Sequence, residues 1–228
     1  MLIILPCAGG SAGNYSGYKQ IPGGMFAYEY PGHWTRFDET LKCDEDYMIR
    51  SLFTEISEGK YGEKINLLGH SMGGLLAWKL AGRLVAEGFN VETLYIAACC
   101  APGVYPDFVR EMKCDEDIKM LLRSIRQVPE KVLESSFFND NLLPVIRNDF
   151  DIVRKILSDE KYHDPDMIPV DIVCLFGNSD PIVRREDMLG WQNCTDRRFD
   201  LMEFEGDHFF LYDKKNEKRF VGTKCEQV

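Results

Sequence analysis

The 228-residue sequence predicts an α/β fold, with a mostly parallel central sheet and helices on both faces. Short apolar runs of strand length alternate with amphipathic stretches of helix length, which is the pattern of repeated strand–helix–strand units. One long stretch holds only helix-like segments, and it predicts a helical lid inserted over residues 105–169. We therefore expect a single domain, residues 1–228, whose lid covers the carboxyl ends of the strands, where parallel sheets bind ligands.

Six short apolar runs predict the strands. In chain order they are Met1–Leu5, Met25–Tyr30, Lys64–Leu68, Val91–Cys99, Val170–Phe176 and Phe199–Phe204. Apolar residues at helical spacing predict the helices. These are Asp44–Ser57, Gly73–Glu87 and, in the insertion, segments around Met120–Ile125, Val132–Phe138 and Leu143–Leu157. The end of the chain, Lys214–Val228, is charged and shows no clear amphipathic helix.

Composition excludes several classes of protein. A content of 45% hydrophobic residues permits a sizeable core, whereas a net charge of −10 argues against a nucleic-acid-binding surface. No apolar run reaches the ~18 residues that span a bilayer, and the apolar start lacks basic residues, so we expect a cytoplasmic protein without membrane contact. The eight cysteines include no C-x-x-C pair, so we expect reduced thiols and no metal. We also expect a monomer that needs no cofactor.

Residues 65–74 form the most informative motif, a buried strand followed by a Gly-x-Ser-x-Gly turn and the start of a helix. This is the layout of a nucleophile elbow, which exposes a serine hydroxyl beside a base. We therefore predict Ser71 as a nucleophile. The N–H of Met72 then lies at a helix N-terminus, where it can stabilise an oxyanion. Gly69 and Gly73 flank the turn, because side chains there would collide with the backbone.

A nucleophilic serine needs a base. The chain has four histidines, which are His33, His70, His163 and His208. His70 directly precedes Ser71, and neighbouring side chains diverge, so it is a poor candidate. His208 lies in the loop after the last predicted strand, on the same side of the sheet as Ser71. We therefore predict His208 as the base.

The acid that orients this histidine is expected at the carboxyl end of an intermediate strand. Asp180 follows the fifth predicted strand directly, whereas Asp207 adjoins His208 and cannot easily reach round to its ring. Glu186 and Asp187 fall in a predicted helix. We therefore predict Asp180, whose place between Ser71 and His208 gives the chain order of the α/β-hydrolase fold.

The loop after the first strand predicts the second oxyanion donor. Its Pro6-Cys7-Ala8-Gly9-Gly10 sequence lets a substrate approach the backbone, and we favour the N–H of Ala8, with Cys7 next. A Lys-Ser/Thr pair does not follow, which excludes a phosphate-binding P-loop.

Four further segments carry a resemblance to a known family. Leu5–Ala12 resembles a P-x-A-G-G-S loop, Tyr30–Glu39 a P-G-x-x-x-R-x-x-E segment, Leu142–Phe150 the lid motif L-P-x-[LI]-R-x-D, and Gly206–Leu211 the ending G-x-H-F-F-L. With the elbow, these motifs resemble type II thioesterases, the stand-alone editing enzymes of non-ribosomal peptide and polyketide synthases. The resemblance covers nearly the whole chain.

The resemblance implies Ser71 as nucleophile, His208 as base and Asp180 as acid. It also implies an acyl-enzyme mechanism on a phosphopantetheine thioester, with an acyl or peptidyl carrier protein as partner. Two alternatives stay open. The same triad would serve a carboxylesterase or lipase-like hydrolase of small molecules, and a catalytically inactive, hydrolase-like binding module would keep the same fold.

Two features of the insertion have more than one interpretation. Its basic residues, Lys119, Arg123, Arg126 and Lys131, form either a docking face for an acidic carrier protein or an ordinary solvated helix face. Its large apolar residues, Leu121, Leu122, Phe137 and Phe138, either line the acyl pocket or pack the lid.

Overall fold

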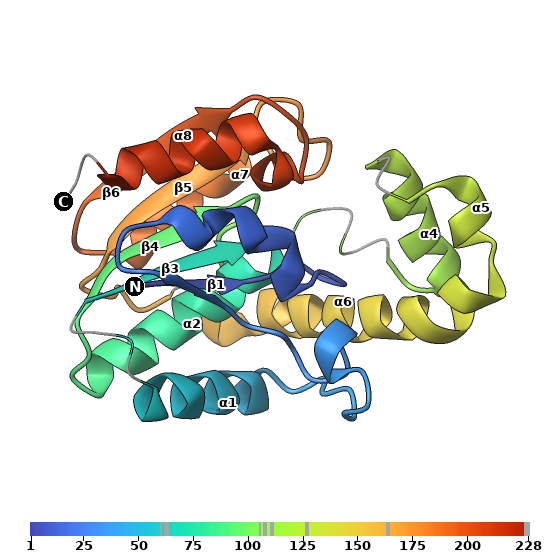
Figure 1. The fold of residues 1–228 in the computed structure, drawn as a ribbon, viewed down its shortest axis with the longest axis horizontal. Coiled ribbons are helices and arrows are strands. Elements are labelled where there is room, and N and C mark those ends of the chain that lie inside the picture. The colour runs from blue at the N-terminus through green and yellow to red at the C-terminus, as the bar shows by residue number, and fades with distance from the viewer. Residues whose placement is uncertain are drawn as a thin grey trace.

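One six-stranded parallel sheet forms the centre of the fold, with strand order β2-β1-β3-β4-β5-β6 (Figure 1). The computed structural model describes residues 1–59, 61, 64–104, 106, 109, 112–125, 128–162 and 165–225. The strands are β1 Leu2–Leu5, β2 Met25–Ala27, β3 Ile65–His70, β4 Val91–Ala97, β5 Asp171–Gly177 and β6 Phe199–Phe204. The predicted parallel sheet is confirmed, although β2 is shorter than its apolar run.

Helices cover both faces of the sheet, because alternate residues of each strand point to opposite sides. In β1, Ile3 and Leu5 join one core cluster, whereas Leu2 and Ile4 join the other. The first face packs against α1 (Glu45–Glu58), α2 (Met72–Ala86) and part of α6 (Leu143–Ser158). The opposite face packs against the 3-10 helix Ala12–Gln20 and against α8 (Lys214–Cys225).

The described part of the chain between β4 and β5 is largely helical. Its main elements are α4 (Asp115–Ser124), α5 (Glu130–Leu133), the π turn Phe138–Leu142 and α6. In Figure 1, α4 and α5 lie beyond the sheet, and α6 runs from them back towards α2. A separate small core holds α4 and α5 to the start of α6, whereas Ile152 and Ile156 of α6 belong to the main core. The lid boundaries at residues 105 and 169 stay a prediction.

The C-terminal helix α8 corrects an expectation, since the charged end of the chain predicted no clear amphipathic helix. Few apolar residues form its inner face, and they are dispersed among lysines and arginines, which hides the helical period. Phe220 is buried, with its ring centroid 5.7 Å from that of Tyr18 and 5.1 Å from that of Tyr95. Asn216 is buried as well and donates to the carbonyls of Glu205 and Phe210 at 2.7 and 2.9 Å.

Short helices complete the fold: Trp34–Arg36, Glu160–Tyr162, α7 Arg185–Met188, Leu189–Cys194 and Phe210–Tyr212. The position of α7 confirms that Glu186 and Asp187 lie in a helix. None of the helices described is both long and apolar enough to span a membrane.

Candidate active site

Ser71 occupies a strained turn between β3 and α2. Its φ of 53° lies in a region that non-glycine residues rarely adopt, and its backbone N–H donates to the Ala97 carbonyl at 2.8 Å. A Cβ atom at Gly69 would overlap the Gly73 carbonyl oxygen, and one at Gly73 would overlap that of Leu5. The turn is therefore sharp because both flanking positions lack side chains, as the sequence predicted for an elbow.

The predicted base and acid are paired. His208 Nδ1 is 2.8 Å from Asp180 Oδ2, and both side chains are nearly enclosed. The other oxygen, Asp180 Oδ1, accepts the backbone N–H groups of Ile182 and Val183 at 2.8 and 3.1 Å. These bonds fix the carboxylate, and the carboxylate fixes the imidazole. Because Nδ1 is hydrogen-bonded to Asp180, Nε2 is the nitrogen of His208 that can accept a proton.

His70 holds the backbone of His208 rather than acting as a second base. Its Nε2 lies 2.8 Å from the His208 carbonyl oxygen, which can only accept, so Nε2 carries the proton. Its Nδ1 then accepts the Tyr15 hydroxyl at 2.9 Å. Burial, and then the neighbouring His208, lower the pKa of His70 to about 3, so the ring is neutral at pH 7. The sequence predicted that His70 is a poor base but did not show this supporting contact.

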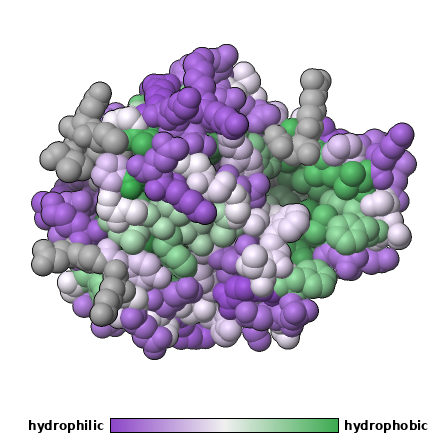
Figure 2. Space-filling model, viewed as in Figure 1, coloured by the Kyte–Doolittle hydropathy of each residue, from purple (hydrophilic) through white to green (hydrophobic). Residues whose placement is uncertain are grey.

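Ser71 and His208 line one cavity, and its other walls are mostly apolar. The lining residues are Cys7, Ala8, Leu121, Leu122, Ile125, Ile146, Phe150, Ile182 and Phe209. Sequence analysis left open whether the large apolar residues of the insertion line the acyl pocket or pack the lid. Leu121 and Leu122 line this cavity, whereas Phe138 is buried in the small core. Phe137 is 64% exposed, and Figure 2 shows apolar residues gathered at this α4–α5 end of the molecule.

Ser71 also lines a second, smaller recess. Met72, Leu75, Cys100, Val153 and Val183 are among its walls. Ser71 therefore lines two largely apolar spaces, one whose wall includes residues of α4 and one whose wall includes residues of α2 and α6.

The loop after β1 turns back on itself beside the elbow. The Gly10 N–H donates to the Cys7 carbonyl at 2.9 Å, and the Ala8 residue between them lines the cavity. The Met72 N–H, the other predicted donor, starts α2, and the first N–H groups of a helix have no acceptor within it. Burial is the main cause that raises the pKa of the Cys7 thiol, to about 11, so this thiol stays protonated at pH 7.

Sequence analysis missed a second buried His–Asp pair beside this loop. His33 Nε2 is 2.9 Å from Asp149 Oδ2, and the Gly9 N–H donates to the same oxygen at 2.7 Å. Both members lie inside motifs that the sequence singled out, the Tyr30–Glu39 segment and the L-P-x-[LI]-R-x-D segment. Their pairing crosses 116 positions of the chain, so spacing could not reveal it. The fourth histidine, His163, lies outside the described residues.

Acidic neighbours offset Arg123, one of the four basic residues that the sequence placed in the insertion. Arg123 bonds to Glu116 at 2.7 Å and to Glu130 at 2.9 Å, which leaves little net positive charge around it. Arg126 lies outside the described residues. The solvated helix face is thus the better interpretation at Arg123.

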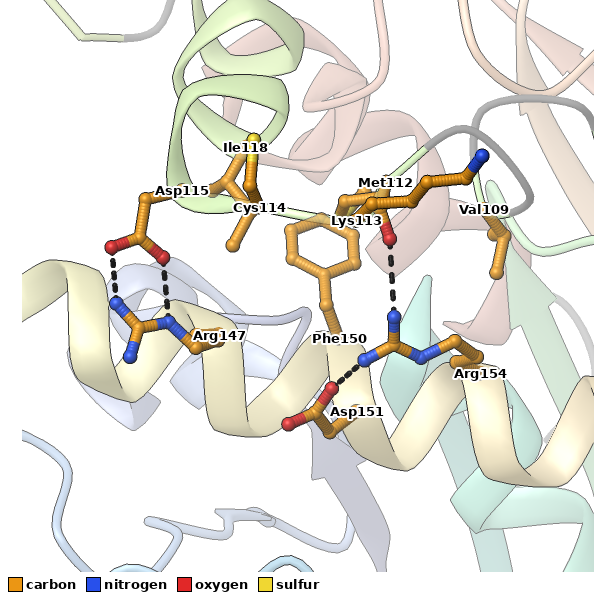
Figure 3. Close-up of a pocket in the computed structure, with 10 residues that line it drawn as sticks. All are labelled: Val109, Met112, Lys113, Cys114, Asp115, Ile118, Arg147, Phe150, Asp151 and Arg154. Atoms are coloured by element: carbon orange, nitrogen blue, oxygen red, sulfur yellow. Dashed lines mark hydrogen bonds and ion pairs between the residues drawn. The ribbon is translucent and has the colours of Figure 1, made fainter.

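Two arginines of α6 line another cavity, which lies between α4 and α6 (Figure 3). Arg147 pairs with Asp115 across this cavity, and Arg154 pairs with Asp151 and donates to the Met112 carbonyl. The ion pair of Arg147 therefore links α4 to α6. Phe150 lines both this cavity and the one that contains Ser71.

Among the residues that the structure describes, none form a cluster of three or more His, Cys, Asp or Glu side chains that could hold a metal ion. The arrangement of Ser71, His208 and Asp180 fits acyl transfer through a serine instead.

The comparisons with known proteins agree with this chemistry. Residues 1–225 match the thioesterase domain family. The chain belongs to this family. The thioesterase is 32% identical to the thioesterase TesA of Mycobacterium marinum, an alignment that covers 92% of this chain and 84% of TesA. This chain is therefore a hydrolase that acts on acyl thioesters.

Solved structures extend the likeness. The type II thioesterase BorB, from the borrelidin biosynthetic cluster, is 29% identical with a TM-score of 0.80, over 99% of this thioesterase and 91% of BorB. RedJ, a thioesterase from the prodiginine biosynthetic pathway of Streptomyces coelicolor, has a TM-score of 0.86 at 22% identity, over 100% of this thioesterase and 89% of RedJ. These structures share the α/β-hydrolase fold of the thioesterase.

Proposed function

We propose that this thioesterase is a type II enzyme that removes acyl groups from the phosphopantetheine arms of carrier proteins in non-ribosomal peptide or polyketide synthesis. The observation that carries the proposal is the His208–Asp180 hydrogen bond of 2.8 Å at the cavity that also contains Ser71. The type II description of BorB, at 29% identity, supports the class. The borrelidin biosynthetic cluster, from which BorB comes, supports a role in such a biosynthetic pathway.

In the first half of the reaction, Ser71 Oγ attacks the thioester carbonyl while His208 Nε2 takes the hydroxyl proton. Asp180 accepts the hydrogen bond from Nδ1–H and stabilises the imidazolium. The backbone N–H groups of Ala8 and Met72 hold the oxyanion of the tetrahedral intermediate. The C–S bond then breaks, the imidazolium gives its proton to the leaving sulfur, and an acyl-Ser71 ester is left.

In the second half, water replaces the thiol. His208 Nε2 takes a proton from water while the water oxygen attacks the acyl-Ser71 carbonyl. A second oxyanion then forms in the same oxyanion hole. Collapse of this intermediate breaks the ester bond, returns the proton to Ser71 Oγ and releases the carboxylic acid. The apolar cavity around Ser71 suits the hydrocarbon part of the acyl group.

The substrate class is tested by comparing two substrates with one acyl group. We expect kcat/KM for an acyl-phosphopantetheinyl carrier protein to exceed that for the p-nitrophenyl ester of the same acid by at least about tenfold, a transition-state difference of about 1.4 kcal/mol. An acyl-pantetheine thioester without protein separates the arm from the carrier. Equal rates, or faster cleavage of the ester, contradict the proposal and favour a small-molecule carboxylesterase.

A further inference from the structure

The buried pair of His33 and Asp149 is absent from the proposed reaction, yet it touches the loop that supplies an oxyanion donor. One oxygen, Asp149 Oδ2, receives the Gly9 N–H at 2.7 Å and His33 Nε2 at 2.9 Å. The side chains of the pair are completely enclosed, each with 0% exposure. Because Gly9 directly follows Ala8, the carboxylate fixes the peptide unit beside the proposed donor.

Hydrogen-bond chemistry shows how the pair is charged. His33 Nδ1 lies 3.1 Å from the Pro31 carbonyl, which can only accept, so Nδ1 carries a proton and Nε2 shares a second proton with Asp149. Burial alone lowers the pKa of His33, but the hydrogen bond and charge of Asp149 outweigh it, so the pKa is raised above its ordinary value. Both ring nitrogens of His33 thus face oxygen acceptors, which is the bonding pattern of an imidazolium beside a carboxylate.

This protonation has a consequence for the oxyanion hole. A lone carboxylate beside the loop would repel a developing oxyanion, and the imidazolium of His33 offsets that charge. The loop is within electrostatic reach, because Asp149 Oδ2 lies 2.7 Å from the backbone nitrogen of Gly9.

Packing reinforces the hydrogen bond. Gly9 has a φ of +65°, and a Cβ atom there would lie 2.7 Å from Ile146 Cγ1. Ile146 and Asp149 are three residues apart on α6, and such residues share a helix face. One face of α6 therefore contacts the loop through a carboxylate and through an apolar side chain.

We infer that Asp149, charge-balanced by His33, is a positioning residue that couples the seating of α6 to the geometry of the oxyanion hole. The hole is complete only when α6 is docked on the loop. This inference rests on the proposed function, because it takes Ser71 as nucleophile and Ala8 as donor. Asp149 touches no reacting atom and acts through Gly9.

The test compares Asp149→Asn with Asp151→Asn, a matched control two residues along α6 whose ion pair with Arg154 is partly exposed. Asparagine offers a single oxygen, carries no charge and cannot balance the imidazolium. The readouts are KM for a short acyl thioester, kcat per site titrated with a fluorophosphonate, and Ki for an alkyl boronic acid. The boronic acid forms a tetrahedral adduct with a catalytic serine and places an oxygen in the oxyanion hole.

For Asp149→Asn we expect kcat per titrated site to fall at least about tenfold, towards the 10²–10³-fold loss of a whole donor. The boronate Ki rises by a similar factor, while KM changes less than about threefold. Asp151→Asn matches the wild type. A purely structural role lowers the number of titrated sites but leaves kcat per site and Ki unchanged, and that result overturns the inference. Failure of the boronate to inhibit the wild type instead contradicts the proposed function.

Gly9→Ala tests the same coupling through packing, should Asp149→Asn fail to fold. The added methyl pushes the loop away from Ile146, so kcat per site and boronate affinity fall together. Adding Ile146→Ala to this variant removes the side-chain atoms that the new methyl would contact. We expect the double variant to recover part of kcat per site and part of the boronate affinity. Wild-type behaviour of Gly9→Ala, or a loss that Ile146→Ala does not relieve, overturns the inference.

Discussion

At the scale of single residues, three side chains that are distant in sequence come to one side of the sheet because parallel strands end there. Ser71 follows β3, Asp180 follows β5 and His208 follows β6. Chain order and strand ends were enough to predict these three positions. Their catalytic roles stay predictions.

The sequence could not reveal the side chains that position other residues of the site by hydrogen bonds to their backbone. His70 holds the His208 carbonyl, and Asp149 holds the Gly9 N–H. Each contact joins segments more than 100 positions apart and involves a backbone group, so no spacing or residue pattern indicates it. Only the folded chain shows which backbone group each side chain meets.

Asp180→Asn tests the predicted acid. The asparagine oxygen still accepts the Ile182 and Val183 N–H groups, but its NH₂ then faces His208 Nδ1 and forces the proton onto Nε2. That tautomer cannot take the Ser71 proton, so we expect kcat to fall about 10⁴-fold, as in other Ser-His-Asp triads.

Asp207→Asn is the matched control, because Asp207 adjoins His208 and its side chain accepts the Phe209 N–H at 2.8 Å, a bond that asparagine keeps. Steady-state kinetics should show kcat within about twofold of the wild type. Equal losses in the two variants would remove Asp180 from the triad.

At the scale of elements, strong periodic patterns were predictable and weak ones were not. The helix α2 was predicted to within one residue at each end, because its apolar residues cover most of its circumference. The helix α8 was missed, since Phe220 and the buried Asn216 carry its inner face among charged residues. Tertiary contacts, rather than an amphipathic period, stabilise that helix.

Phe220→Ala tests the contribution of α8 to stability. The deleted ring packs against Tyr18 and Tyr95, so we expect the free energy of unfolding to fall by about 3–5 kcal/mol in urea titrations. The α8 helix packs on the sheet face opposite α2, so kcat per folded molecule should stay within about twofold.

Phe137→Ala is the control for this loss, because Phe137 is 64% exposed. Its substitution should change the free energy of unfolding by no more than about 0.5 kcal/mol. A similarly small change for Phe220→Ala would show that α8 adds little to the stability of the fold.

At the scale of the whole molecule, the sheet, the elbow and the helical insertion assemble one apolar cavity around Ser71. Alternating apolar and amphipathic segments predicted the sheet, and the Gly-x-Ser-x-Gly motif predicted the class of chemistry. The sequence did not predict that acidic partners offset Arg123, because ion pairs such as Arg123–Glu130 form only once α4 and α5 are packed. A net charge of −10 is consistent with that balance.

The central claim is that Ser71 carries the acyl group during turnover. Its most direct test is rapid quenching of the enzyme with an acyl thioester, followed by digestion and peptide mass spectrometry. We predict an acyl adduct on the peptide that contains Ser71, and neither adduct nor turnover in folded Ser71→Ala. An adduct on Cys7, which lines the same cavity, or continued turnover by Ser71→Ala would contradict the account.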